Sequence, residues 1–233
     1  MRFHPEILME DGDILVCRKP AGVPVQTGRT GQPDLERVLK NYRALKKEPP
    51  EIYIVHRLDQ PVEGVMVFAK NRKAAASLSK QIQEKGVGKY YYAVTEGVVE
   101  PREGTLTDFL MRDGKSNTSR VVAEGTKNAK KAVLSYRRIQ SLEGKSLVEI
   151  CLHTGRHHQI RVQMAHAGYP LIGDRKYSTG CGEIYMPVGL CSVRIEFLHP
   201  STGKRIEYDM APQGEAFQLF GEIRQNFTDK SLN

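Results

Sequence analysis

The sequence predicts a protein that contains both β-strands and α-helices within one compact domain. Short runs rich in β-branched residues alternate with turns that contain Gly and Pro, a pattern typical of strands. Two other segments repeat apolar residues at the spacing of amphipathic helices. A chain of 233 residues with 39% apolar content can build one substantial core but is short for two full domains. We therefore expect a single domain over residues 1–233.

The first expected strand, residues 14–17, runs into the turn Lys19-Pro20-Ala21-Gly22. A central pair of apolar, β-branched strands follows at residues 52–55 and 65–68. The polar loop between them contains Asp59, whose carboxylate a rigid sheet would hold while leaving it open to a ligand. Local chemistry also allows Asp59 simply to accept backbone hydrogen bonds within its turn.

Amphipathic helices are expected on either side of this strand pair. In the first, apolar residues recur at i, i+3, i+4, i+7 and i+10, namely Leu35, Val38, Leu39, Tyr42 and Leu45. This stripe predicts a side that faces the core, whereas Arg43, Lys46 and Lys47 are expected on a solvated face with some chance of phosphate contact. In the second, Asn71 can cap a helix that ends at Gly86.

More strands are expected in the second half of the chain. Residues 89–97 form a tyrosine-rich run of strand type that a glycine closes. Residues 112–131 are rich in Lys, Arg, Asn, Ser and Gly and predict a long exposed connection, which either contacts a ligand or is simply solvated. Strands at residues 132–139 and 146–152 are joined by a turn at residues 143–145.

The net charge of +8 and a pI near 9.3 favour a polyanionic partner, and nucleic acid fits best. Many mildly basic proteins have no such partner, so charge alone does not decide. No apolar run approaches the ~18 residues that span a bilayer, and the first residues lack the pattern of a signal peptide. The four cysteines form no C-x-x-C pair. We expect a soluble, cytoplasmic protein with reduced thiols.

The central loop carries a recognisable motif. His56-Arg57-Leu58-Asp59 is followed by Gly64 and by an apolar strand that ends in Ala69-Lys70. This stretch resembles the signature of the RluA-type pseudouridine synthases: His-Arg-Leu-Asp, two variable positions, Thr-Ser-Gly, an apolar strand and Ala-Lys. Val62-Glu63 replaces the usual Thr-Ser, and Gln60 stands where Arg is common.

Later stretches continue the likeness in the family's order. Residues 152–161 closely match the family's Leu-x-Thr-Gly-Arg-x-His-Gln-Ile-Arg, and Tyr91 falls on the tyrosine of its Lys-x-Tyr-x-Ala strand. The other matching stretches are residues 19–22, 168–174, 197–200 and 211–212. The resemblance therefore covers nearly the whole chain.

The resemblance implies an α+β pseudouridine synthase fold, in which helices flank a central mixed, mainly antiparallel sheet and a catalytic cleft crosses the sheet. It implies one pseudouridine synthase catalytic domain over residues 1–233, without an S4-like RNA-binding domain ahead of it. The implied activity is isomerisation of specific uridines to pseudouridine in ribosomal or transfer RNA. No cofactor or metal is expected, and a monomer is the default.

The resemblance also implies the catalytic residues. Asp59 would act at the anomeric carbon of the uridine as nucleophile, base or stabiliser of positive charge. Arg161 would form an ion pair that keeps Asp59 ionised. Tyr91 would line the pocket against the base, where it helps to remove the C5 proton or stacks.

Substrate-binding residues follow by the same resemblance. Because base chemistry inside a helix is sterically blocked, the target must be extruded, and Arg57 would fill the gap that it leaves. Leu152 would supply an apolar wall, and His56 belongs to the same motif as Arg57. Arg156 and Lys70 are candidates for phosphate contacts or for structural roles.

Three alternatives remain open. His153, His157, His158 and His166 suggest a metal, but no Glu follows the first His as in a zincin and no carboxylate completes the set. Glu63, four residues from Asp59, raises a two-carboxylate glycosidase. The third alternative is a catalytically inactive RNA-binding module of the same fold, its activity lost with Thr-Ser.

Overall fold

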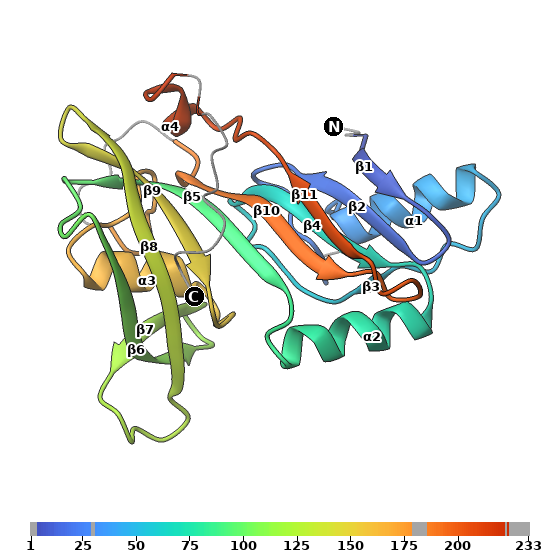
Figure 1. The fold of residues 1–233 in the computed structure, drawn as a ribbon, viewed down its shortest axis with the longest axis horizontal. Coiled ribbons are helices and arrows are strands. Elements are labelled where there is room, and N and C mark those ends of the chain that lie inside the picture. The colour runs from blue at the N-terminus through green and yellow to red at the C-terminus, as the bar shows by residue number, and fades with distance from the viewer. Residues whose placement is uncertain (1–3, 29–30, 179–185, 222, 224–233) are drawn as a thin grey trace. The chain divides into compact units, whose positions relative to one another are not determined.

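The computed structural model describes residues 4–28, 31–178, 186–221 and 223 (Figure 1). The chain divides into two compact units. Unit 1 comprises residues 1–88 and 192–210, and unit 2 comprises residues 89–191 and 211–233. The single domain expected over residues 1–233 stays a prediction.

Unit 1 is a sheet with two helices. Its strands are β1 (Glu6–Glu10), β2 (Ile14–Lys19), β3 (Tyr53–Ile54), β4 (Glu63–Ala69), β10 (Leu190–Leu198) and β11 (Arg205–Asp209). They lie in the order β1-β2-β4-β10, with β3 paired to β4 and β11 paired to β10 (Figure 1). The helices are α1 (Leu35–Leu45) and α2 (Arg72–Gln83).

The core of unit 1 lies along β2 and β4, which pair antiparallel with Leu15 opposite Phe68. Every residue of β4 is buried, as is typical of a strand covered on both faces. Helix α2 packs on β4 through Leu78, and Asn71 caps it by accepting a hydrogen bond from the Ala74 N–H, as predicted.

The last turn of α1 differs from its predicted pattern. Leu45, expected in the core, is 86% exposed, whereas Arg43, expected on the solvated face, is buried. The guanidinium of Arg43 donates to the carbonyl oxygens of Glu51 and Lys70 and contacts the Glu48 carboxylate. Because these acceptors belong to residues that follow α1 and draw the Arg43 guanidinium inward, Arg43 is buried and Leu45 is exposed.

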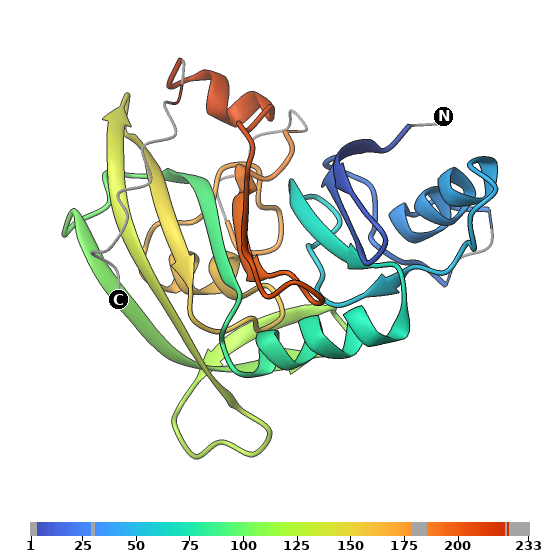
Figure 2. The same cartoon turned by 45° about the vertical axis from the view of Figure 1, so that its right-hand side comes forward.

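Unit 2 is an antiparallel sheet with one longer helix. Its strands are β5 (Gly88–Glu96), β6 (Glu103–Asp113), β7 (Thr118–Val122), β8 (Lys130–Leu142) and β9 (Lys145–Leu152), in the order β5-β9-β8-β6-β7. The helices are α3 (Gln159–His166) and α4 (Glu215–Gln218). The long strands β8 and β9 run side by side in both views (Figures 1 and 2).

One connection in unit 2 was predicted wrongly. Residues 112–131 are not a continuous exposed loop, because they contain β7, which pairs with β6 from Phe109–Val122 to Asp113–Thr118. The turn at residues 143–145 is confirmed, and both Glu143 and Gly144 have the positive φ that tight hairpins require.

The α+β class is confirmed, since each unit combines strands with helices and every pairing with an assigned register is antiparallel. None of the helices in the described residues has both the length and the apolar character needed to span a membrane.

Gly64, in β4, gives a test of the close packing in unit 1. Its φ is +145°, and a Cβ there would lie 2.5 Å from the backbone N and O of Ser192 in β10. Gly64→Ala should therefore lower the free energy of unfolding by more than about 3 kcal/mol, because it adds a clash to backbone strain. Urea unfolding measures this. Gly12→Ala is the control, since nothing lies within 4 Å of its Cβ position, and an equal loss in both variants would contradict the packing.

Candidate active site

Asp59 lies in the loop between β3 and β4, at the start of a tight turn. The Val62 N–H donates to the Asp59 carbonyl oxygen at 3.1 Å and closes this turn, residues 59–62, called the Asp59 turn below. Before the turn, His56 Nε2 accepts a hydrogen bond from the Val67 N–H at 3.1 Å. An accepting Nε2 carries no proton, so His56 fixes the loop to β4 in its neutral form.

A buried ammonium group, that of Lys19, holds the Asp59 turn through its backbone carbonyl oxygens. Lys19, at the end of β2, is fully buried, and its Nζ donates to the carbonyl oxygens of Pro20, Gln60 and Val62 at 2.9, 3.0 and 2.6 Å. Two of these oxygens belong to the Asp59 turn. Gly22 adds a bond from its N–H to the Gln60 carbonyl, and the Gln60 amide donates back to the Gly22 carbonyl.

The charge on Lys19 is coupled to the acidic residues of the same loop. Burial lowers the pKa of Lys19 to about 7, and the negative charges of Asp59 and Glu63 oppose this shift. The protonated form alone offers three N–H groups for three carbonyl oxygens. The negative charge of Asp59 therefore favours protonated Lys19, the form that holds the Asp59 turn.

The Glu63 side chain is buried next to Arg18. It lies at the start of β4, where Oε2 of Glu63 is 3.9 Å from Nη1 of Arg18. Arg18 also contacts Glu6, at 2.9 Å. Val62 is buried too, while its carbonyl bonds to Lys19. A carboxylate buried against an arginine is structural, which argues against Glu63 as the second acid of a glycosidase.

Arg57 points away from this packing. It is exposed, and its Nη2 donates to the Gln26 side-chain oxygen at 3.1 Å, the one hydrogen bond of this side chain to the residues that the structure describes. A single neutral acceptor at the surface leaves the guanidinium able to exchange partners.

Tyr91 and Leu152 lie on neighbouring strands of unit 2. Tyr91, in β5, is 6% exposed and lies opposite Ile150 of β9. Leu152 is the half-buried last residue of β9. Tyr92, on the opposite face of β5, is buried in the core, as expected of a packing residue.

Arg161, in α3, makes a buried ion pair that the sequence analysis missed. Its Nε and Nη2 donate to the two carboxylate oxygens of Asp174, both at 2.7 Å. The exposed fractions of the two residues are 3% and 0%. A bidentate pair of this kind fixes the plane of the guanidinium. Asp174 was visible in the motif at residues 168–174, although only geometry reveals its partner.

Tyr177 adds a second restraint on Arg161, whose guanidinium lies 5.3 Å from the centre of the Tyr177 ring. The Tyr177 hydroxyl accepts from the Ser119 N–H at 2.7 Å and shares a hydrogen bond of 2.7 Å with Nδ1 of His158. Burial, followed by the positive charge of Arg161, lowers the pKa of His158 to about 2. His158 is therefore neutral at the N-terminus of α3.

The remaining site residue of unit 2, Arg156, is exposed and donates from Nε to the Lys131 carbonyl at 3.0 Å. Its backbone is fixed by Gln159, whose side-chain oxygen accepts from the Arg156 N–H at 3.0 Å and from the Thr154 hydroxyl at 2.8 Å. The Thr-Gly-Arg segment is thus a rigid turn that presents the Arg156 side chain at the surface.

Of the four histidines considered as metal ligands, His153, His157 and His158 are hydrogen-bonded to hydroxyl groups, whereas His166 Nδ1 lies 3.3 Å from Asp108 Oδ1. Nε2 of His153 lies 2.8 Å from the Ser135 hydroxyl, and Nδ1 of His157 lies 2.9 Å from the Ser119 hydroxyl. Within the part of the chain that the structure describes, no three His, Cys, Asp or Glu side chains are grouped as metal ligands.

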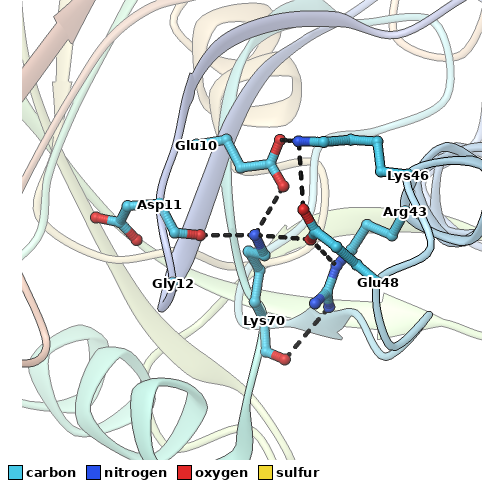
Figure 3. Close-up of a pocket in the computed structure, with 7 residues that line it drawn as sticks. All are labelled: Glu10, Asp11, Gly12, Arg43, Lys46, Glu48 and Lys70. Atoms are coloured by element: carbon cyan, nitrogen blue, oxygen red, sulfur yellow. Dashed lines mark hydrogen bonds and ion pairs between the residues drawn. The ribbon is translucent and has the colours of Figure 1, made fainter.

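A hollow of about 430 Å³ in unit 1 is lined by Glu10, Asp11, Gly12, Arg43, Lys46, Glu48 and Lys70 (Figure 3). Lys70 Nζ contacts Glu10 at 2.7 Å, Glu48 at 3.1 Å and the Asp11 carbonyl at 2.6 Å. Burial raises the pKa of Glu10, but hydrogen bonds from Lys46, Lys70 and Tyr42 outweigh it and lower the pKa to about 2. Of the two roles considered for Lys70, these ion pairs favour the structural one.

The structure thus brings His56, Arg57 and Asp59 together in unit 1, in one loop. It places Tyr91, Leu152, Arg156 and Arg161 in unit 2.

Comparisons with known proteins bear on the family and the fold. The family model for RNA pseudouridylate synthase matches residues 13–166. The Vibrio vulnificus dual-specificity RNA pseudouridine synthase RluA is 34% identical over 237 residues, which cover 97% of this chain and 93% of that protein. The Bacillus subtilis RNA pseudouridine synthase YhcT is 35% identical over 207 residues, and the match covers 86% of this chain and 66% of YhcT.

Among solved structures, human RNA pseudouridylate synthase domain containing 4 aligns with a TM-score of 0.76 at 25% identity. The alignment covers 92% of each chain. The expected pseudouridine synthase fold is thereby confirmed.

The hold of Lys19 on the Asp59 turn is tested by Lys19→Met. The change leaves the buried carbonyl oxygens of Pro20 and Val62 without the ammonium donor, so the free energy of unfolding should fall by about 2–4 kcal/mol. Chemical denaturation measures this. Lys40→Met is the control, because Lys40 pairs only with Glu36 at the surface and should cost less than about 1 kcal/mol. Equal losses would contradict the role of Lys19.

The neutral state of His158 predicts a dependence of stability on pH. Its folded-state pKa is depressed, so its contribution is full above the ordinary pKa of 6.5 and decreases as the pH falls from 6.5 towards about 2. Below pH 6.5 this group should remove at most about 1.4 kcal/mol per pH unit. Unfolding curves between pH 7.5 and 5 should diverge, with wild type losing more than His158→Gln. Parallel curves would show that His158 can take up a proton while folded.

Proposed function

Since the chain belongs to the RNA pseudouridylate synthase family, we propose that it isomerises uridine to pseudouridine in RNA with the Asp59 carboxylate. The observation that carries the proposal is the hold on the Asp59 turn. Lys19 bonds its backbone on both sides of Pro61, and His56 bonds the preceding segment to β4. A reactive group gains rate from such a fixed position, because little orientation remains to be acquired in the transition state.

The reaction breaks the bond between N1 of uracil and C1′ of the ribose and forms a bond between C5 and C1′. The C5 proton leaves and N1 gains a proton, so atoms and electrons balance without an oxidant or reductant. A carboxylate suits the step at C1′, where positive charge develops as the glycosidic bond breaks. Asp59 would act there as nucleophile, base or electrostatic stabiliser.

Arg161 is proposed as the cation that keeps Asp59 ionised during this step. What supports it is the bidentate pair with Asp174 and the contact with the Tyr177 ring, which orient the guanidinium before substrate arrives. A guanidinium has five N–H donors, so one arginine is chemically able to bind two carboxylates.

Tyr91 and Leu152 would enclose the uracil. Both side chains are largely apolar and come from the paired strands β5 and β9, and Tyr91 would add a hydroxyl near the base. Arg57 is exposed and weakly engaged, as needed for a side chain that fills the space of an extruded nucleotide. Arg156, presented by a rigid turn, would contact backbone phosphate.

The substrates proposed are specific uridines of ribosomal or transfer RNA. The net charge of +8 supports a polyanionic partner. We further propose that the protein acts as a monomer in the cytoplasm, without a metal or redox cofactor, since the isomerisation requires none.

Release of tritium from RNA labelled at C5 of uridine tests the activity, using ribosomal and transfer RNA fractions from cells that lack this protein. Wild type should release tritium from at least one fraction. Asp59→Asn, which keeps the shape but removes the charge, should reduce the rate at least about 10³-fold. Its RNA affinity should stay close to wild type.

Glu63→Gln is the matched control, because it makes the same change to a carboxylate buried against Arg18. It should retain turnover within about tenfold. RNA binding by wild type without tritium release from either fraction would instead support the inactive binding module.

A further inference from the structure

Lys89, at the beginning of β5, is half-buried and differs from the buried cations among the described residues. Lys19, Lys70, Arg43 and Arg161 each have carboxylate or carbonyl acceptors. Among the residues that the structure describes, Lys89 is assigned neither a carboxylate nor a hydrogen-bond acceptor. Burial lowers its pKa, and only the Cys151 thiol on β9 acts in the opposite direction. An ammonium without a counter-charge destabilises the free protein, and a bound anion would compensate.

The position of Lys89 fits an anion next to the uracil. Lys89 and Tyr91 are two residues apart in one strand, so their side chains leave the same face with Cα atoms about 6.6 Å apart. Tyr91 is the residue proposed to lie against the base. The Lys89 ammonium is therefore within one nucleotide's reach of that base.

Gly155 lies next to this ammonium. Gly155 is exposed and has no positive φ, so its backbone conformation does not require glycine. A Cβ at Gly155 would lie 3.2 Å from Nζ of Lys89, closer than ordinary contact. A side chain at position 155 would therefore lie directly against the ammonium and displace it by a few tenths of an ångström. Arg156, the next residue in the chain, is exposed and positively charged.

We propose that Lys89 binds a backbone phosphate of the RNA adjacent to the target uridine, at the position next to Gly155. The inference rests on the proposed function, because it takes RNA as the ligand. It assigns Lys89 to substrate binding and leaves the chemistry at C1′ to Asp59.

The test compares Lys89→Gln with wild type on the RNA fraction from which wild type releases tritium, at several salt concentrations. Loss of one buried phosphate contact should raise KM about tenfold and leave kcat within about twofold. The slope of log(kcat/KM) against log salt should become shallower by about 0.7–0.9, the value expected for one phosphate. Lys89→Arg keeps the charge and should keep most of the slope.

Two further variants serve as a control and as a second test of Lys89. Lys145→Gln removes the same charge at the opposite end of β9 from Leu152 and should behave as wild type. Gly155→Ala leaves the charge but displaces the ammonium, so it should raise KM in the same direction as Lys89→Gln. Equilibrium binding of the same RNA, measured with Asp59→Asn as background, repeats the comparison without turnover.

Wild-type KM and salt slope in Lys89→Gln would overturn the proposal for Lys89, as would a fall in kcat at unchanged KM and slope. Neither result affects the proposed isomerisation. Absence of tritium release by wild type would instead contradict the isomerisation, and the binding comparison would still decide the role of Lys89.

Discussion

The bond between the Lys19 ammonium and the backbone of the Asp59 turn is the constraint on which the proposed chemistry depends. A single cation reaches three carbonyl oxygens, two of them in the turn, from a position with no contact with water. Neutral donors would leave one or more of these oxygens unsatisfied at a cost of about 1–3 kcal/mol each. The turn is therefore held through its main chain.

Much of the fold follows from the sequence because burial leaves a pattern. The apolar, β-branched run of β4 and the Asn71 cap of α2 are visible in the residue types alone. The wrong predictions, for β7 and for Arg43, concern structure that depends on contacts with other segments. Strand β7 is short and polar, and its pairing depends on β6 rather than on its own composition. Arg43 is buried by acceptors from residues that follow the helix, which no periodicity within α1 can show.

Asp59, Tyr91 and Arg161 were picked out because their side chains stand in fixed motifs, and their catalytic roles stay predictions. The hold of Lys19 on the Asp59 turn was not predicted. Lys19 donates to backbone carbonyl oxygens, which every residue has, so the residue types do not reveal the contact. The Arg161–Asp174 pair was missed for another reason. The sequence offered Asp59 as the partner of Arg161, while the bidentate geometry with Asp174 appears only when the segment after α3 is folded back on it.

The replacement of Thr-Ser by Val62-Glu63 has an evolutionary consequence. Glu63 is buried against Arg18, which in turn reaches Glu6, so the three charges depend on one another across β1, β2 and β4. Serine at position 63 alone would remove one of the two carboxylates beside Arg18 and leave Glu6 as its remaining counter-charge. The substitution is thus entrenched: a lineage that returns to the usual motif loses part of the charge balance around Arg18 unless its neighbours change as well, and residues grafted singly between such sequences should show epistasis.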